Sequence, residues 1–214
     1  AVAVGSGSGF RSRVSAGLAP KDVARFYDGF GMMQDYERLY TDHATSTLRQ
    51  YARLGAANTV FEFGCGTGAL AKKMLESDLA DSARYVGMDI SATMVEITRK
   101  RLRPWGPRAE VLLSDGGSGL DEIADGSIDR IVTTYVFDAI SDEYLADLLK
   151  SMARVLTPDG RLCVASLTFG NTPFAAAMTS MWVGLYGCAP SWLGGCRPLE
   201  VARLLRANGW SVEQ

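Results

Sequence analysis

The sequence predicts an α/β fold: a doubly wound, mostly parallel sheet with helices on both faces. Two observations carry this prediction. From residue 59 onward, strand and helix patterns alternate along the chain, as they do when parallel strands are joined by crossover helices. The strands are short, continuous apolar runs, as expected for central strands covered on both sides. In such sheets a ligand binds beyond the carboxyl ends of the strands, where the strand order reverses.

Hydrophobic spacing and capping residues place each element in order. Helices are expected at 22–27 and 35–54, followed by a strand at 59–63, a helix at 69–77 and a strand at 85–89. Ser91 caps the next helix, which ends near Leu102. Then come strands at 110–113 and 128–135, a helix at 142–156 with two acids in its first turn, a turn at 157–160 and a strand at 162–167. Pro173 begins an apolar helix, Pro198 opens a helix at 199–208 that Gly209 ends, and residues 210–213 begin one more strand.

Composition predicts a single globular domain. Of the 214 residues, 47% are hydrophobic and 21% are charged, which is ordinary for a chain that builds one sizeable core. We expect residues 1–19 to form a flexible N-terminal segment, because residues 1–9 are small and of low complexity, like a linker or an expression remnant. Residues 20–214 then form the domain, with a helical cap at 20–55 and an apolar lid at 170–197.

The net charge bears on whether the protein binds nucleic acid, and the cysteines bear on the cellular compartment. The formal net charge is -2, whereas general nucleic-acid binders carry a basic excess, so no nucleic-acid partner is expected. The densest basic run, Arg99 to Arg103, is typical of the solvated end of a helix. Cys65, Cys163, Cys188 and Cys196 show no CxxC spacing. We therefore expect a reducing cytoplasm, no disulfide framework and no metal site.

The stretch FEFGCGTGAL, residues 61–70, is the best candidate for a binding loop. A strand, a glycine-rich turn and a helix N-terminus expose backbone N–H groups and let a ligand approach closely. The loop also fits the GxGxxG/A fingerprint of dinucleotide enzymes. Glu62 favours another ligand, because an acid at this strand end repels a phosphate and attracts an ammonium group. Asp89 ends the second strand, where a carboxylate accepts hydrogen bonds from ribose hydroxyls in either kind of site.

Four motifs, 61-FEFGCGTG-68, 87-GMDIS-91, 113-LSDGG-117 and 157-TPDGRL-162, resemble those of the class I S-adenosylmethionine-dependent methyltransferases, which have a Rossmann-like fold. The resemblance covers roughly residues 20 to 214. It implies S-adenosyl-L-methionine as cofactor and S-adenosyl-L-homocysteine as product. It also implies that the glycine loop wraps the methionine end, that Asp89 holds the ribose, and that Asp115 receives the adenine amino group. The candidate cofactor-binding residues are Glu62, Gly64, Cys65, Gly66, Gly68, Asp89, Ile90, Met94, Ser114, Asp115, Gly116, Tyr135 and Val136.

Two further segments bear on the resemblance. The stretch 23-VARFYDGF-30 looks like the YD element of the branch that contains quinone-biosynthesis and phospholipid methyltransferases, which would place Tyr27 over the cofactor or the substrate. The family sheet ends in an antiparallel pair of strands, whereas this chain stops at SVEQ, inside the first of them. The C-terminal strands of the sheet are therefore expected to be incomplete, which leaves a sticky edge.

Methyl transfer requires an oriented nucleophile, exclusion of water and, for some acceptors, a base. His43 is the only histidine and suits a base at neutral pH, or it packs at the edge of an apolar helix face. Asp138 follows the fourth strand, where it contacts substrate or serves as a helix cap or solvated loop acid. Tyr27 orients substrate or packs between the N-terminal helices. The catalytic candidates are thus Tyr27, Asp138 and His43, and the substrate candidates are Phe137, Tyr40 and Trp182.

No residue from Leu162 to Cys196 is charged. The apolar helix expected within this stretch is shorter than the roughly 20 residues that a membrane span needs. It is an ordinary packed helix, a Met- and Trp-rich lid over an apolar substrate, or a dimer face. Peripheral membrane contact and the oligomeric state both stay open.

The sequence thus predicts S-adenosylmethionine-dependent methyl transfer to a small-molecule or lipid-like acceptor. One alternative is an NAD(P)-dependent oxidoreductase, which Glu62 disfavours and for which no Tyr/Lys hydride-site pair is found. A second alternative is a methyltransferase-like module that binds the cofactor without turnover.

Overall fold

The computed structural model describes residues 20–30, 38–169, 173–188 and 196–213. Its centre is a five-stranded sheet with the strand order β3-β2-β1-β4-β5, in which every neighbouring pair is parallel. The strands are β1 (Thr59–Phe63), β2 (Arg84–Asp89), β3 (Ala109–Leu113), β4 (Ile128–Thr134) and β5 (Leu156–Ala165). The order reverses between β1 and β4, so the loop after β1 lies at the topological switch point. This confirms the predicted doubly wound α/β fold.

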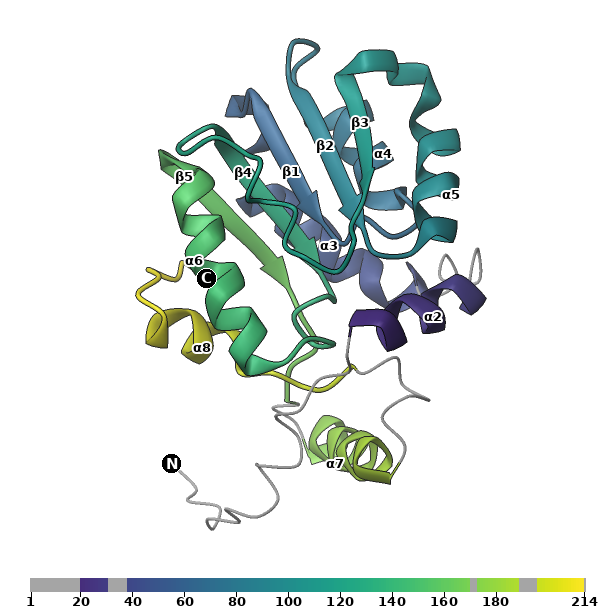
Figure 1. Ribbon diagram of the computed structural model, residues 1–214. Helices are drawn as coiled ribbons and strands as arrows, with labels where there is room; N and C mark the ends of the chain where they lie inside the picture. The colour runs from purple at the N-terminus through teal and green to yellow at the C-terminus, as the bar shows by residue number, and fades with distance from the viewer. Residues whose placement is uncertain (1–19, 31–37, 170–172, 189–195, 214) are drawn as a thin grey trace.

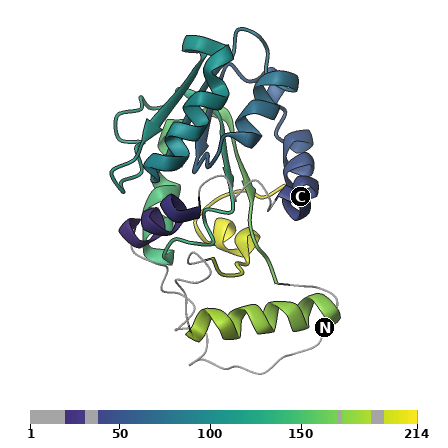
Figure 2. The same ribbon diagram turned by 90° about the vertical axis from the view of Figure 1, so that its right-hand side faces the viewer.

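Helices cover both faces of the sheet (Figure 1). On one face lie α3 (Arg38–Tyr51), the short η2 (Leu54–Ala56), α4 (Ala69–Ser77) and α5 (Ala92–Leu102), which η3 (Arg103–Arg108) follows. On the other face lie α6 (Asp142–Val155) and α8 (Val201–Ala207). Two helices, α2 (Pro20–Phe30) and α7 (Pro173–Cys188), instead lie beyond the carboxyl ends of the strands (Figures 1 and 2). We refer to these two helices as the cap. Helix α3, which was part of the cap expected at 20–55, instead packs on the sheet through Leu48.

The core consists of two layers because successive side chains of a strand point to opposite faces. In β1, Val60 belongs to the layer beneath α4 and α5, while Phe61 and Phe63 belong to the layer beneath α6. Burial of an aromatic side chain such as Phe61 contributes about 2–3 kcal/mol. The apolar side chains of β1 thus hold helices on both faces of the sheet.

Local signals set the ends of several helices. The Ser91 side chain accepts a hydrogen bond from the Met94 N–H at 3.2 Å and caps α5, as predicted. Ser141 caps α6 through the Tyr144 N–H, and the expected two acids occupy the first turn of that helix. Gly209, at φ 83°, follows the end of α8. Ordinary capping chemistry therefore fixes these boundaries.

Three expectations for the elements need correction or refinement. Residues 210–213 form no strand: Trp210 and Val212 pack against the α6-side core, and a strand requires backbone pairing that alternating side chains alone do not supply. The turn expected at 157–160 lies within β5. The register between β4 and β5 shifts there, because Ile128 pairs with Leu156 and Arg130 pairs with Arg161, so that the extra residues of β5 form an irregularity like a β-bulge. Of the long helix expected at 35–54, residues 38–51 are helical, and residues 35–37 lie outside the described part of the chain.

Candidate functional site

The glycine loop joins β1 to α4 at the switch point. Gly64, Gly66 and Gly68 have φ values of 74°, 52° and 72°, a region that side chains with a Cβ atom avoid. The N–H groups of Gly64 and Cys65 both donate to the Met88 backbone oxygen, at 2.8 and 2.9 Å. The loop is thereby fastened to the end of β2, and its left-handed turns keep the backbone open to a ligand.

Asp89, the last residue of β2, organises the neighbouring turns. Its two carboxylate oxygens accept the N–H groups of Gly66 and Ser91, at 2.8 and 2.9 Å. Burial raises the pKa of this carboxyl, and the backbone hydrogen bonds oppose that rise. The Ser114 N–H donates to the Asp89 backbone oxygen at 2.8 Å. The fold therefore brings together three predicted cofactor residues from the ends of β1, β2 and β3.

Glu62 lies in β1 beneath the glycine loop and is only 1% exposed. Its Oε2 atom accepts a hydrogen bond from the Tyr85 hydroxyl at 2.6 Å. Burial raises its pKa to about 8, while the Tyr85 hydrogen bond works in the other direction. A nearby cation would stabilise the ionised carboxylate and lower this pKa. Its expected association with a ligand ammonium group stays a prediction.

The chain after β4 approaches the same loop. A Cβ atom built at Gly64 would lie 2.2 Å from the Val136 Cγ2 atom, so only glycine allows this contact. Tyr135 has φ 58°, a conformation that is costly for a residue with a large side chain and is typical of functional sites. The structure thus places Val136, a predicted cofactor-binding residue, against the glycine loop, with Tyr135, another such candidate, directly before it in the chain.

Phe137 and Asp138 point into the protein. Phe137 is buried in the core layer beneath α6. Asp138 accepts hydrogen bonds from the Leu167 N–H at 2.9 Å and from the Ser166 hydroxyl. Burial raises its pKa to about 6, against the lowering effect of these two hydrogen bonds and the smaller effect of the nearby Arg197 guanidinium. In this structure both side chains are covered, and Asp138 links the ends of β4 and β5. Their proposed contacts with an acceptor stay predictions.

The loop after β3 carries the adenine-end candidates. Ser114 is partly buried, and its hydroxyl receives the Gly116 N–H at 3.1 Å, while Gly116 itself has φ 104°. Asp115 is exposed, and its Oδ1 atom accepts the Gly117 N–H at 2.9 Å. The Asp115 carboxylate is therefore held by a backbone group of its own turn while the residue stays exposed.

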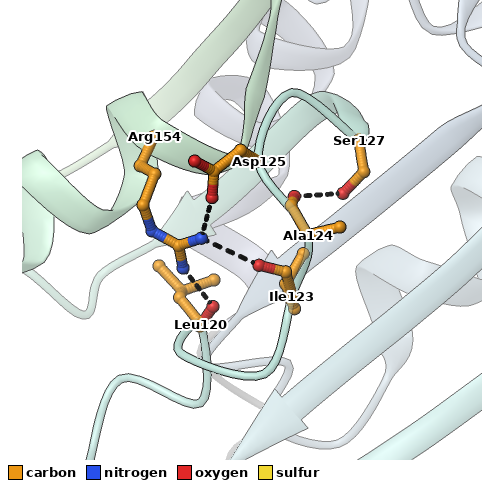
Figure 3. Close-up of polar contacts among 6 residues, drawn as sticks. All are labelled: Leu120, Ile123, Ala124, Asp125, Ser127 and Arg154. Atoms are coloured by element: carbon orange, nitrogen blue, oxygen red, sulfur yellow. Dashed lines mark hydrogen bonds and ion pairs between the residues drawn. The ribbon is translucent and has the colours of Figure 1, made fainter.

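Arg154 of α6 holds the far part of this loop (Figure 3). Its guanidinium donates to the backbone oxygens of Leu120 and Ile123, at 2.7 and 3.0 Å, and also pairs with Asp125. The Ser127 hydroxyl donates to the Ala124 oxygen at 2.6 Å. A long connection between β3 and β4 is thus fixed by side chains where secondary structure does not satisfy its carbonyls.

Two arginines of the basic run donate hydrogen bonds to backbone near the site. This corrects the expectation that the run is only the solvated end of a helix. Arg101 Nη1 donates to the Thr67 backbone oxygen and hydroxyl, both at 2.8 Å. Arg99 donates through two nitrogens to the Val111 backbone oxygen, at 2.8 and 3.1 Å. Their guanidinium groups therefore contribute to fixing the backbone of the glycine loop and of β3.

Helix α2 reaches the site through a residue that the sequence reasoning missed. The Asp28 Oδ1 atom accepts the Ser91 hydroxyl at 2.6 Å and lies 3.4 Å from the Thr93 N–H. These hydrogen bonds lower the pKa of Asp28. The position of Asp28 beside Tyr27 in the YD element was the available signal. The acid thus docks the cap onto the turn that follows Asp89.

The remaining candidates lie partly in the glycine loop and on or just before α5, and partly on α3 and α7. Met94 and Cys65 are buried, Ile90 is partly exposed, and burial raises the pKa of the Cys65 thiol. His43 lies on α3 and is exposed, and the Tyr40 side chain lies outside the described residues. Trp182 is 37% exposed on α7. Among the residues that the structure describes, no cluster of three His, Cys, Asp or Glu side chains is suited to hold a metal ion.

The comparison with protein families agrees with this geometry. Residues 60–160 match the family model described as a methyltransferase domain. An uncharacterised methyltransferase of Oceanobacillus iheyensis is 30% identical over 67% of this chain and 66% of its own length. The ubiquinone/menaquinone biosynthesis C-methyltransferase of an Enterobacter strain is 32% identical over 68% of this chain and 54% of its own length. A tRNA N(3)-methylcytidine methyltransferase of Drosophila melanogaster is 29% identical over 66% of this chain and 46% of its own length.

Solved structures share the fold. A putative methyltransferase in complex with the Haloferax volcanii Trm112 activator superimposes with a TM-score of 0.66 at 17% identity, over 88% of this chain and 77% of that one. Geranyl diphosphate C-methyltransferase from Streptomyces coelicolor, solved with S-adenosyl-L-homocysteine, gives 0.57 at 19% identity, over 76% and 59%. Residues 60–160 thus belong to a methyltransferase domain, in agreement with the resemblance to the class I S-adenosylmethionine-dependent methyltransferases seen in the motifs. The chain spans about half to two thirds of the length of the curated relatives named above.

Proposed function

We propose that this protein binds S-adenosyl-L-methionine and transfers its methyl group to a small, apolar or lipid-like acceptor. The observation that supports the cofactor best is the glycine loop with its three left-handed glycines, fastened through Gly66 to the Asp89 carboxylate. The close packing of Val136 over Gly64 leaves room for backbone but not for a side chain, as a close-fitting ligand cradle requires. The residues present therefore fit this cofactor.

The chain's own residues have positioning roles in this proposal. Asp89 would accept the ribose hydroxyls, and Asp115 would accept the adenine amino group. Glu62 would pair with the amino-acid ammonium, while Tyr135 and Val136 would flank the reacting centre. When bound, the cofactor supplies an intrinsically reactive sulfonium methyl group. The protein needs mainly to orient the acceptor and to exclude water.

The acceptor class is inferred from the cap. Helix α7 lies beyond the strand ends (Figure 2) and exposes Met181, Trp182 and Leu185. No charged residue occurs from 162 to 196, so this segment has no side chain that would pair with a charged acceptor. An apolar acceptor would gain free energy by covering these side chains. No helix among the described residues is long and apolar enough to cross a membrane.

Two measurements test the proposal in turn. Isothermal titration calorimetry with S-adenosyl-L-homocysteine, NAD and NADP should show tight binding of the first ligand alone. Binding of NAD alone would overturn the cofactor assignment and favour an oxidoreductase. Transfer of a radiolabelled methyl group to a lipid or quinol fraction, compared with a tRNA fraction, then tests the acceptor. Labelling of the tRNA fraction without labelling of the lipid fraction would overturn the proposal of an apolar acceptor. The tRNA fraction is included because one relative is a tRNA methyltransferase.

A further inference from the structure

Arg197 is a buried arginine to which the proposed methyl transfer assigns no role. Arg197 is only 3% exposed. A buried guanidinium requires hydrogen-bond or charged partners that offset its desolvation. Its Nη2 atom donates to the Ile140 backbone oxygen at 2.9 Å and to the Asp142 carboxylate at 2.6 Å. Its backbone N–H donates to the Asp138 backbone oxygen at 3.1 Å. These partners all lie between the end of β4 and the first turn of α6.

That same segment begins at the glycine loop. Tyr135 has its costly backbone conformation there, and Val136 packs over Gly64. A strained conformation persists only where the surrounding structure holds it. Asp138 fastens the segment to the end of β5 through Ser166 and Leu167. Arg197 fastens its other end, so the segment is held from two sides.

The residue before Arg197 receives contacts from the cap. The Trp182 Nε1–H group on α7 donates to the Cys196 backbone oxygen at 2.9 Å. The Tyr27 hydroxyl on α2 lies 3.8 Å from the Cys196 Sγ atom. Cys196 and Arg197 therefore join both cap helices to the segment after β4.

We propose that Arg197 is a positioning residue that fixes segment 135–140 at the methionine end of the cofactor site and links that segment to the cap. The inference rests on the proposed function, because it takes the ligand's amino-acid end to lie against Gly64 and Val136. The adenosine end, at Asp89 and Ser114, is built from β2 and β3, which lie on the other side of β1 in the strand order. Removal of the guanidinium should therefore affect one end of the ligand and spare the other.

Two ligands that share the adenosine end make this selective effect measurable. S-Adenosyl-L-homocysteine has the amino-acid end, and 5′-methylthioadenosine lacks it. In calorimetric titrations, Arg197→Met should weaken S-adenosyl-L-homocysteine binding by about tenfold and 5′-methylthioadenosine binding by less than about twofold, since one charge-assisted anchor is lost at one end. Arg203→Met is the matched control, because Arg203 is an exposed arginine that pairs with Glu200 on the surface, and it should change neither affinity.

Equal weakening of both ligands in Arg197→Met would show a merely structural residue and overturn the inference. If Arg197→Met does not fold, two milder variants replace it in the same titrations. Arg197→Lys keeps the positive charge, and Asp142→Asn removes the negative charge of one partner from the exposed side. Each should weaken S-adenosyl-L-homocysteine selectively but less strongly, and an unchanged ratio of the two affinities in both would also overturn the inference. Failure of the wild-type protein to bind either ligand would instead overturn the proposed function itself.

Discussion

The two ends of the site are assembled from different distances along the chain. On the cofactor side, the Gly66–Asp89 and Glu62–Tyr85 hydrogen bonds each join residues 23 positions apart, the separation of consecutive strands in a βαβ unit. Between the methionine end and the cap, which we call the acceptor side because the proposed acceptor would bind there, the hydrogen-bonded Ile140 and Arg197 are 57 positions apart, and Tyr27 and Cys196 are 169 apart. The cofactor side is therefore a local product of successive motifs, whereas the acceptor side depends on remote segments that return to the same place.

The two sides also differ in charge. The cofactor side holds the buried carboxyls of Glu62 and Asp89, whose pKa values burial raises. The acceptor side exposes Met181, Trp182 and Leu185 on a helix in an uncharged stretch. Under the proposed function, the first side would receive a polar, cationic cofactor and the second an apolar acceptor.

The largest effect is expected where the two sides touch. Gly64→Ala places a side chain in the left-handed region and drives it into Val136. It should lower the free energy of unfolding by about 2–5 kcal/mol and abolish S-adenosyl-L-homocysteine binding, as measured by urea denaturation and calorimetry. Gly209→Ala is the control, because φ is 83° but no atom beyond the neighbouring residues of the chain lies within 4 Å of the added Cβ. It should cost about 1–2 kcal/mol and leave binding unchanged. Equal behaviour of the two variants would show that Val136 does not matter.

The next prediction divides the cofactor side into its two proposed anchors. Asp89→Ala removes a buried acceptor of two backbone N–H groups and should weaken S-adenosyl-L-homocysteine binding about 30- to 100-fold. Asp115→Ala removes an exposed carboxyl and should weaken it by only about three- to tenfold. Calorimetry on both variants, with thermal unfolding as a check of the fold, gives the comparison. Unchanged affinity in Asp89→Ala would refute the ribose assignment, and unchanged affinity in Asp115→Ala the adenine assignment.

The buried acid of β1 predicts how stability depends on pH. The pKa of Glu62 is raised from 4.5 to about 8 in the folded protein, so between these values the folded state holds a proton that the unfolded state has lost. The contribution of this pKa shift to the free energy of unfolding is fully present below about pH 4.5 and is lost as the pH rises toward about 8. Urea titrations should show wild-type stability falling across this window by on the order of 2 kcal/mol relative to Glu62→Gln. A constant difference between the two proteins at every pH would contradict the raised pKa.

The smallest effect is expected at the contact between α2 and the turn that follows Asp89. Asp28→Ala removes the acceptor for the Ser91 hydroxyl and should lower stability by about 1 kcal/mol, with faster proteolytic cleavage within α2. Asp22→Ala on the same helix removes only an exposed pair with Arg25. It should therefore change neither quantity. Cleavage at wild-type rates in Asp28→Ala would mean that other contacts dock α2.

Much of the cofactor side could be predicted because its signals are short and local. The apolar run of β1, the spaced glycines and the terminal Asp89 identify the switch point without any tertiary information. The role of Arg101 was missed because a basic residue near a helix end is equally typical of solvent exposure, and only packing shows its bond to Thr67. The strand expected at 210–213 was wrong because alternation of apolar and polar residues does not provide a pairing partner.

The amino-acid sequence alone determined the fold class, the family and the position of the cofactor loop, because strand periodicity and glycine conformation are properties of neighbouring residues. Only the tertiary structure showed that Asp138 faces inward to Ser166 and Leu167, and that Arg197 lies under the segment after β4. These contacts join residues that are remote in the chain. Their burial and partners follow from how the segments pack, and no local pattern encodes that packing.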